Sequence, residues 1–146
     1  MTRIPEAKLL KPVLRLFPCR AYIHLEQVPL GRKKIDLVCL DRRAAIGTSV
    51  ELKVADWRRA VWQAAINFQV TEFSYIALWH EFVHRAVSEI ELLKHYGVGL
   101  IGVDRSRAEI LLRSARKAHT VGRDRKRQWY EQLLEQAQEV LHGRRL

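Results

Sequence analysis

Three charged residues interrupt apolar runs near the centre of the chain. Asp36 lies in the run KIDLVCLD, and Glu51 and Lys53 lie in the run SVELKV, with a turn between the two runs. Acidic residues and lysines are uncommon inside strands, so their presence here indicates a function. Carboxylates on neighbouring strands can bind a hard cation such as Mg²⁺, which stabilises charge on a phosphoryl group and supplies a nucleophilic water. Asp36 and Glu51 are therefore candidate ligands of a hard divalent cation.

A hairpin would bring the two carboxylates together. Side chains alternate between the faces of a strand, so Asp36 shares a face with Val38, and Glu51 shares one with Lys53. A short even-numbered loop near Arg43 places Asp36 opposite Glu51, with their Cβ atoms roughly 5 Å apart. A slip of one residue would separate them. The opposite face of the hairpin is then apolar and comprises Ile35, Leu37, Cys39, Val50, Leu52 and Val54.

Helical and strand periodicities predict the elements around this hairpin. We expect a helix between Pro5 and Pro18, a strand over residues 20–26, the hairpin, a helix from Asp56 to Phe68, a strand over 73–79, a helix over 81–96, and strands over 98–103 and 108–112. The order αβββαβαββ predicts an α/β fold with a mixed sheet flanked by helices. The connection between the second hairpin strand and the strand over 73–79 has the length of a parallel crossover.

The length of 146 residues suits one folded domain. We expect that domain to span residues 1–117 and residues 118–146 to form a basic linker and a C-terminal amphipathic helix. This helix could dock on the domain or on a second copy of the chain, which makes a homodimer possible. Its apolar side comprises Tyr130, Leu133, Leu134, Ala137, Val140 and Leu141.

The helix that follows the hairpin carries a polar row beside its buried stripe. Arg59, Gln63 and Asn67 recur at every fourth position, so they lie on one side of the helix. Because this row borders the core side, it could face the carboxylates.

The combination of Asp36, Glu51-x-Lys53 and Gln63 on the next helix resembles the PD-(D/E)XK nuclease superfamily. The resemblance covers about residues 6–103 and implies a restriction-endonuclease-like fold. It implies that Asp36 and Glu51 bind Mg²⁺, for which Mn²⁺ could substitute, and that Lys53 orients or activates the attacking water. Gln63 matches a glutamine often found on this helix in the family. Ile35 replaces the proline that gives the motif its first letter.

The same resemblance implies a further acidic residue at the metal site, and two residues compete for that role. Glu6 lies near the start of the first expected helix, and Glu26 ends the first expected strand. The implied activity is metal-dependent hydrolysis of DNA as an endonuclease or exonuclease. A nucleic-acid-binding or protein-interaction module without cleavage is the alternative on the same fold, and a structural ion pair between Glu51 and Lys53 is the simplest alternative of all.

A second motif, His80-Glu81-x-x-His84, fits the HExxH pattern of zinc metallopeptidases. The motif directly follows an expected strand, the extended form of the pattern is absent, and a remote residue such as Glu109 would have to supply the third ligand. Chance is the favoured interpretation in a chain with six histidines.

The charge of the chain favours a polyanionic partner. Twenty-six Lys and Arg residues against sixteen Asp and Glu residues give a net charge of +10, which suits DNA, although a solvated basic surface would also account for it. The residues best placed to bind backbone phosphates are Arg32, Lys33, Lys34, Arg58 and Arg59.

The sequence also predicts where the protein works. We expect an intracellular, cytoplasmic protein that does not bind membranes, because the first 17 residues do not resemble a signal peptide and no run has the length of a membrane span. Cys19 and Cys39 are expected to lie in strands as core residues.

Overall fold

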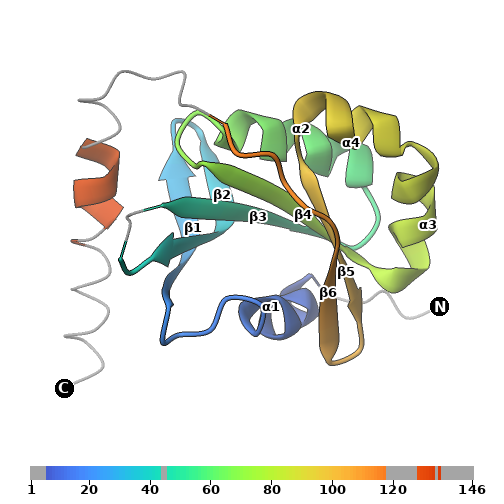
Figure 1. Ribbon diagram of the computed structural model, residues 1–146, viewed down its shortest axis with the longest axis horizontal. Helices are drawn as coiled ribbons and strands as arrows, with labels where there is room; N and C mark the ends of the chain where they lie inside the picture. The colour runs from blue at the N-terminus through green and yellow to red at the C-terminus, as the bar shows by residue number, and fades with distance from the viewer. Residues whose placement is uncertain (1–5, 44–45, 118–127, 134, 136–146) are drawn as a thin grey trace.

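The computed structural model describes residues 6–43, 46–117, 128–133 and 135. Within these residues, six strands form one mixed sheet with helices on both of its faces (Figure 1). The strands are β1 (Tyr22–Leu30), β2 (Lys33–Asp41), β3 (Gly47–Lys53), β4 (Phe73–Trp79), β5 (Gly99–Asp104) and β6 (Arg107–Leu112). The helices are α1 (Ala7–Leu14), α2 (Trp57–Asn67), α3 (His80–Ser88) and α4 (Ile90–Tyr96).

The strands lie in the sheet in the order in which they occur in the chain. Strands β1, β2 and β3 are antiparallel, β3, β4 and β5 are parallel, and β6 returns antiparallel to β5. Helix α2 connects β3 to β4, as the crossover length predicts. The α/β class and the mixed sheet flanked by helices are therefore confirmed.

The helix expected over residues 81–96 is instead two helices. Glu89 has φ −119° and ψ 37°, which separates α3 from α4. Gly97, in the left-handed region with φ 73°, ends α4 as expected. The apolar period continues across the break, so the sequence gives no sign of it.

The first strand is longer than expected and contains Pro29. Because β1 is at the edge of the sheet, a residue without an N–H is tolerated there. The turn between β1 and β2 follows Leu30, where Gly31 adopts φ 59°. Cys19 lies in the connection between α1 and β1 and is exposed, so its expected place in the core is wrong, whereas Cys39 on β2 is buried.

Helices cover the two faces of the sheet with separate hydrophobic cores. Helix α1 covers one face, and α2, α3 and α4 cover the other (Figure 1). On the α1 side, Leu9 and Val13 pack against the expected apolar face of the hairpin, which is confirmed for Leu37, Cys39, Val50, Leu52 and Val54.

Ile35 departs from this pattern and packs in a third core, with its cross-strand partner Val28 and with Leu25. Gln27 lies between Leu25 and Val28 and has φ 51°, which turns the chain so that both leucine and valine reach the same core. Ile35, the cross-strand partner of Val28, points to the same core as Val28. At the start of β2 the side chains are therefore turned relative to those in the rest of the strand.

Helical residues 128–133 complete the third core. Tyr130 and Leu133 are buried against β1 and β2, as a helix docked on its own domain requires. The Tyr130 hydroxyl donates to Glu72 Oε2 at 2.8 Å, and the main-chain N–H of Gly47 donates to the same carboxylate oxygen at 2.7 Å. The side chains of Tyr130 and Leu133 thus pack against the sheet of their own chain. Of the expected linker and helix, residues 118–127, 134 and 136–146 lie outside the described residues.

Within the described part of the chain, no helix combines the length and the apolar character needed to cross a membrane.

Candidate active site

The hairpin of β2 and β3 has the register that the sequence predicts. Leu37 pairs with Val50 and Val38 with Ser49, and the same register continued by one position places Asp36 opposite Glu51. The main-chain N–H of Asp36 donates to Glu51 Oε2 at 3.4 Å, and the main-chain N–H of Leu52 donates to Asp36 Oδ2 at 2.8 Å. Each carboxylate is therefore held by the backbone of the other carboxylate's strand.

Asp36 also has a neighbour on its other side. Gln27 on β1 donates from Nε2 to Asp36 Oδ1 at 3.5 Å, which is long for a hydrogen bond. Gln27, Asp36 and Glu51 thus form a polar row across three adjacent strands.

Glu51 is only 2% exposed, and three donors converge on its Oε2 atom. Besides the N–H of Asp36, Asn67 Nδ2 lies at 3.0 Å and Lys33 Nζ at 3.6 Å. Burial raises the pKa of the Glu51 carboxyl, although the positive charge of Lys33 opposes this shift. Burial likewise lowers the pKa of the Lys33 ammonium, and Glu51 opposes that shift. Desolvation therefore works against both charges, and their pairing offsets part of its cost.

Helix α2 lies next to this site and contributes residues of the expected polar row of Arg59, Gln63 and Asn67. Asn67 contacts Glu51 directly, accepts from Lys33 Nζ at 2.6 Å, and is fully buried. Gln63 accepts from Lys33 Nζ through its main-chain carbonyl at 3.3 Å, while its side-chain Oε1 is buried and has no hydrogen-bond partner among the described residues. Arg59 is exposed and contacts neither carboxylate in the described residues.

Asn67 is fixed by a chain of buried hydroxyls beneath α2. Thr71 Oγ1 donates to the Asn67 carbonyl at 3.0 Å and lies 3.2 Å from Ser49 Oγ. Ser49 in turn lies 2.8 Å from Ser74 Oγ, which donates to the Ala64 carbonyl at 2.6 Å. The carboxylate of Glu51 is thus the end of a hydrogen-bonded network that ties β3 and β4 to α2.

Lys53 lies near the carboxylates in sequence but is paired elsewhere. Its Nζ is 3.9 Å from Glu6 Oε1, next to the start of α1, and its side chain is 22% exposed. Glu6 is thereby linked to the strand that bears Glu51. Glu26 is exposed and contacts neither Asp36 nor Glu51 in the described residues. Among those residues, no three His, Cys, Asp or Glu side chains are grouped to hold a metal ion, so the two carboxylates stand as a pair.

Two members of this site are not among the predicted catalytic residues. Lys33, which the sequence assigns to a DNA-binding surface, points its ammonium at Glu51. Alternation along β2 would put Lys33 on the face away from Asp36, yet its Nζ lies 3.6 Å from Glu51 Oε2. Asn67 does carry a signal, because it belongs to the same helical row as Gln63.

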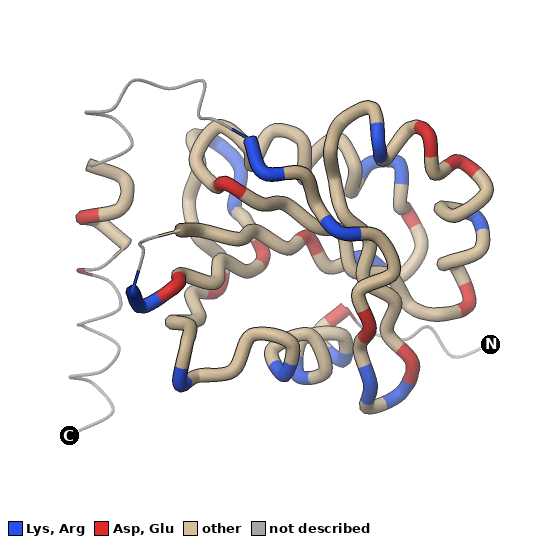
Figure 2. The backbone as a smooth tube through the Cα atoms, viewed as in Figure 1, with Lys and Arg blue, Asp and Glu red and all other residues tan. Residues whose placement is uncertain are grey.

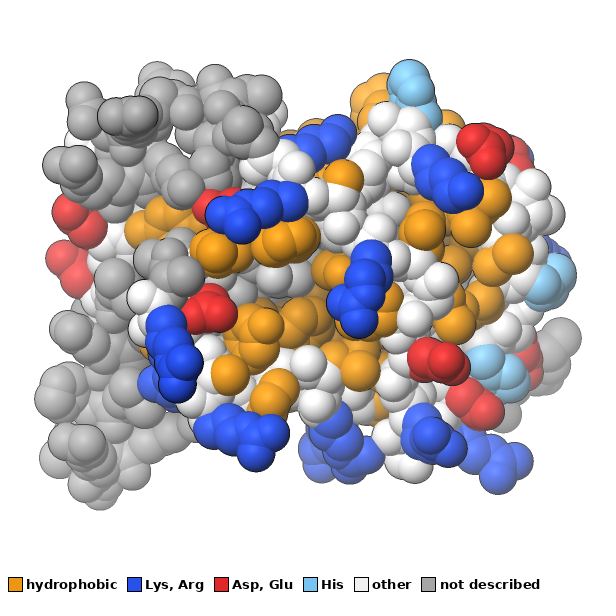
Figure 3. Space-filling view, in the orientation of Figure 1, with side chains coloured by type: hydrophobic (Ala, Val, Ile, Leu, Met, Phe, Trp, Pro, Cys, Tyr) orange, Lys and Arg blue, Asp and Glu red, His pale blue; other side chains and the backbone are white. Residues whose placement is uncertain are grey.

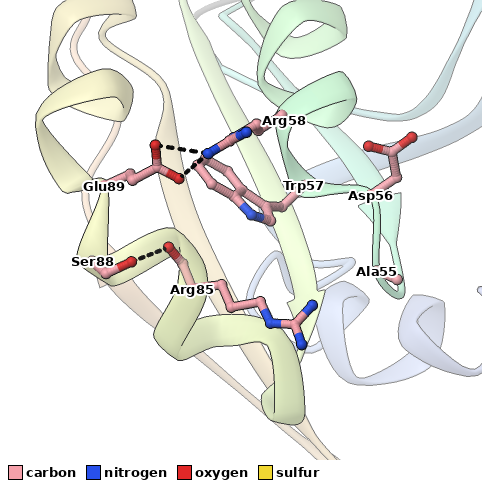
Figure 4. Close-up of a pocket in the computed structure, with 7 residues that line it drawn as sticks. All are labelled: Ala55, Asp56, Trp57, Arg58, Arg85, Ser88 and Glu89. Atoms are coloured by element: carbon pink, nitrogen blue, oxygen red, sulfur yellow. Dashed lines mark hydrogen bonds and ion pairs between the residues drawn. The ribbon is translucent and has the colours of Figure 1, made fainter.

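The remaining basic candidates have different surroundings. Arg58 donates to both oxygens of Glu89, at 3.0 and 2.7 Å, and its guanidinium lies over the Trp57 ring. This pair and Arg85 line a cavity of about 420 Å³ beside the start of α2 (Figure 4). Other lysines and arginines are spread around the fold (Figure 2). Arg32, Lys34 and Arg59 are exposed.

A second hollow lies on the α1 side of the sheet. It measures about 410 Å³, and its walls include Phe17, Tyr22, Phe73, Tyr75 and Ile110. Figure 3 shows hydrophobic side chains gathered on this face between surrounding lysines and arginines. None of the predicted catalytic residues lines it.

The HExxH residues lie at the start of α3 and are exposed. His80 Nε2 is 3.7 Å from Asp104 Oδ1, and Glu81 and His84 face solvent. Glu109 lines the same cavity as His80 and Asp104, but the described residues include no three-ligand group there.

Comparisons with known proteins bear on the fold alone. Neither a protein-family model nor a curated protein matches the chain. A solved structure of SPO1766, a protein of unknown function from Silicibacter pomeroyi, is similar with a TM-score of 0.73 and 18% identity. The match covers 99% of this chain and 94% of that chain. The likeness therefore extends over the whole arrangement of helices and strands.

Proposed function

We propose that this protein is a metal-dependent nuclease of the PD-(D/E)XK type, with a restriction-endonuclease-like fold, that hydrolyses DNA phosphodiesters. The observation that carries the proposal is the cross-strand pair of Asp36 and Glu51, with Lys53 two residues beyond Glu51 on the same strand. Such a pair of buried or half-buried carboxylates costs desolvation free energy, which a function would explain.

The donor atoms of the pair suit a hard divalent cation. The described contacts of Glu51 all use Oε2, and the short contact of Asp36 uses Oδ2. Within the described residues, Glu51 Oε1 has no contact and Asp36 Oδ1 has only the long contact from Gln27 at 3.5 Å, so both oxygens could serve an ion. Mg²⁺ commonly binds through one or two carboxylates while it keeps several waters. Bound there, Mg²⁺ or Mn²⁺ would supply charge stabilisation for the phosphoryl group and an activated water.

The chain's own residues would position these groups. The N–H groups of Leu52 and Asp36 and the amide of Asn67 fix the two carboxylates, so little reorganisation is needed when substrate binds. Lys53, held loosely by the half-exposed Glu6, could reach a phosphate or orient the attacking water. The net charge of +10 would attract DNA to the site.

A module that binds nucleic acid without cleaving it is the second candidate. The observation in its favour is that Lys33 and Asn67 already satisfy Glu51, as a purely structural polar cluster would do. In that case the protein would bind DNA with strong salt dependence and leave it intact.

The two functions are separated by one experiment. Plasmid, linear and branched DNA are incubated with wild type and with Asp36→Asn, in Mg²⁺, Mn²⁺ and EDTA. The matched control is Asp56→Asn, which changes an exposed aspartate whose side chain does not cap α2. Metal-dependent cleavage by wild type and the control, lost in Asp36→Asn, supports the nuclease. Salt-dependent binding without turnover of any substrate supports the binding module.

A further inference from the structure

Lys33 is the cation closest to the buried carboxylate of Glu51. Its Nζ lies 3.6 Å from Glu51 Oε2, whereas Lys53 is directed to Glu6. Because Glu51 is 2% exposed, its charge needs a partner inside the protein whenever no metal ion is bound. We propose that Lys33 is an exchangeable counter-charge, which neutralises Glu51 in the metal-free protein and yields that role to a divalent ion. This inference rests on the proposed metal site.

The contacts of Lys33 are arranged for such an exchange. Nζ lies 2.6 Å from Asn67 Oδ1 and 3.3 Å from the Gln63 carbonyl, both closer than the carboxylate. The distance to Glu51 exceeds that of an ordinary N–H···O hydrogen bond. Two neutral oxygens therefore hold the ammonium, and it keeps both hydrogen bonds when an ion takes over the charge of Glu51.

The exchange has two opposite consequences for the protein. Lys33 stabilises the metal-free fold, because it prevents an uncompensated buried carboxylate. It also weakens cation binding, since an ammonium beside Glu51 repels a divalent ion at the same carboxylate. The affinity of the site for metal is thus set in part by a residue that is not itself a metal ligand.

Calorimetric titration with Mg²⁺ and Mn²⁺ tests this inference on wild type, Lys33→Gln and Lys33→Met. Lys11→Met is the matched control, because Lys11 is an exposed lysine on α1 and lies outside the candidate site. We expect both Lys33 variants to bind metal at least about tenfold more tightly than wild type and the control. Thermal unfolding should show a lower Tm for both variants in EDTA and a larger rise in Tm with metal.

A second background keeps the test decisive if a Lys33 variant folds poorly. Adding Glu51→Gln to Lys33→Met removes the uncompensated charge, so the double variant should be more stable in EDTA than Lys33→Met alone. Equal or weaker metal binding by the Lys33 variants, or no recovery in the double variant, would overturn the exchange. Absence of metal binding by wild type would overturn both this inference and the proposed nuclease. Metal binding that responds to Lys33 without DNA cleavage would support the exchange and overturn only the nuclease.

Discussion

The main-chain N–H of Asp36 donates to the Glu51 carboxylate, 3.4 Å away across two antiparallel strands. The position of Glu51 thus depends on the backbone of Asp36 and not on its side chain. The contact of the Asp36 side chain with the N–H of Leu52 can be kept by an amide oxygen. A substitution of Asp36 by Asn can therefore remove the negative charge of residue 36 while the hydrogen bonds that support the fold are kept.

Asp36→Asn should therefore abolish metal binding without unfolding the protein. Loss of one of two carboxylates should lower metal-dependent cleavage by about 10²–10³-fold or more. Cleavage assays and calorimetric metal titration measure the loss, and circular dichroism checks the fold. Cleavage at the wild-type rate by Asp36→Asn would exclude this carboxylate pair as the catalytic site.

Lys53→Met should impair cleavage while leaving stability almost unchanged. The ion pair of Lys53 with Glu6 is partly exposed and 3.9 Å long, so its loss should change the free energy of unfolding by less than about 1 kcal/mol. Metal affinity should hold, because Lys53 contacts neither carboxylate in the described residues. Glu6→Gln tests the partner of Lys53 in the same assays. A loss of metal binding as large as that in Asp36→Asn would identify Glu6 as the third acidic ligand. Metal binding at the wild-type level would favour Glu26 or a site of two carboxylates.

The two cysteines should differ sharply toward a thiol reagent such as a disulfide dye. Cys19 is exposed, whereas Cys39 is fully buried and burial strongly raises the pKa of its thiol. Because the thiolate is the reactive form, one thiol should react in the native protein and a second only in denaturant. In Cys19→Ser the fast reaction should disappear; a fast reaction that persists would place Cys39 within reach of solvent.

The central hairpin could be predicted because its signals are local. The spacing of Asp36 and Glu51 about the turn sets the register, and alternation assigns most of the apolar side chains to the α1 face. The buried stripe of α2 and the length of the crossover likewise follow from periodicity. Asn67 lies one helical turn after Gln63 on the same side of α2, so the polar row also indicates that Asn67 could lie beside Glu51.

The role of Lys33 could not be predicted, because it depends on backbone geometry in another strand. Gln27 adopts a positive φ without being glycine, and the neighbouring start of β2 turns with it. The break at Glu89 is hidden for a related reason, since apolar residues continue at helical spacing through it. In both places tertiary packing decides a conformation that composition and period leave open.

Tyr130→Phe should destabilise the fold by about 1–3 kcal/mol, since it removes a hydrogen bond to the buried Glu72 carboxylate and leaves the main-chain N–H of Gly47 as the other donor described there. Burial, and next the charge of Glu72, raise the pKa of the Tyr130 phenol above its ordinary value of 10.0. The folded protein therefore keeps this proton when the unfolded chain loses it, so the contribution of Tyr130 is complete below pH 10 and declines above it. Unfolding of wild type and Tyr130→Phe in denaturant at pH 8 and at about pH 11 should show a difference in the free energy of unfolding that narrows at the higher pH.

Tyr96→Phe is the matched control for Tyr130→Phe, because Tyr96 is half-buried and its hydroxyl has no hydrogen bond within the described residues. A difference that stays constant with pH, or an equal loss in Tyr96→Phe, would mean that the bond to Glu72 does not hold the C-terminal segment on the sheet.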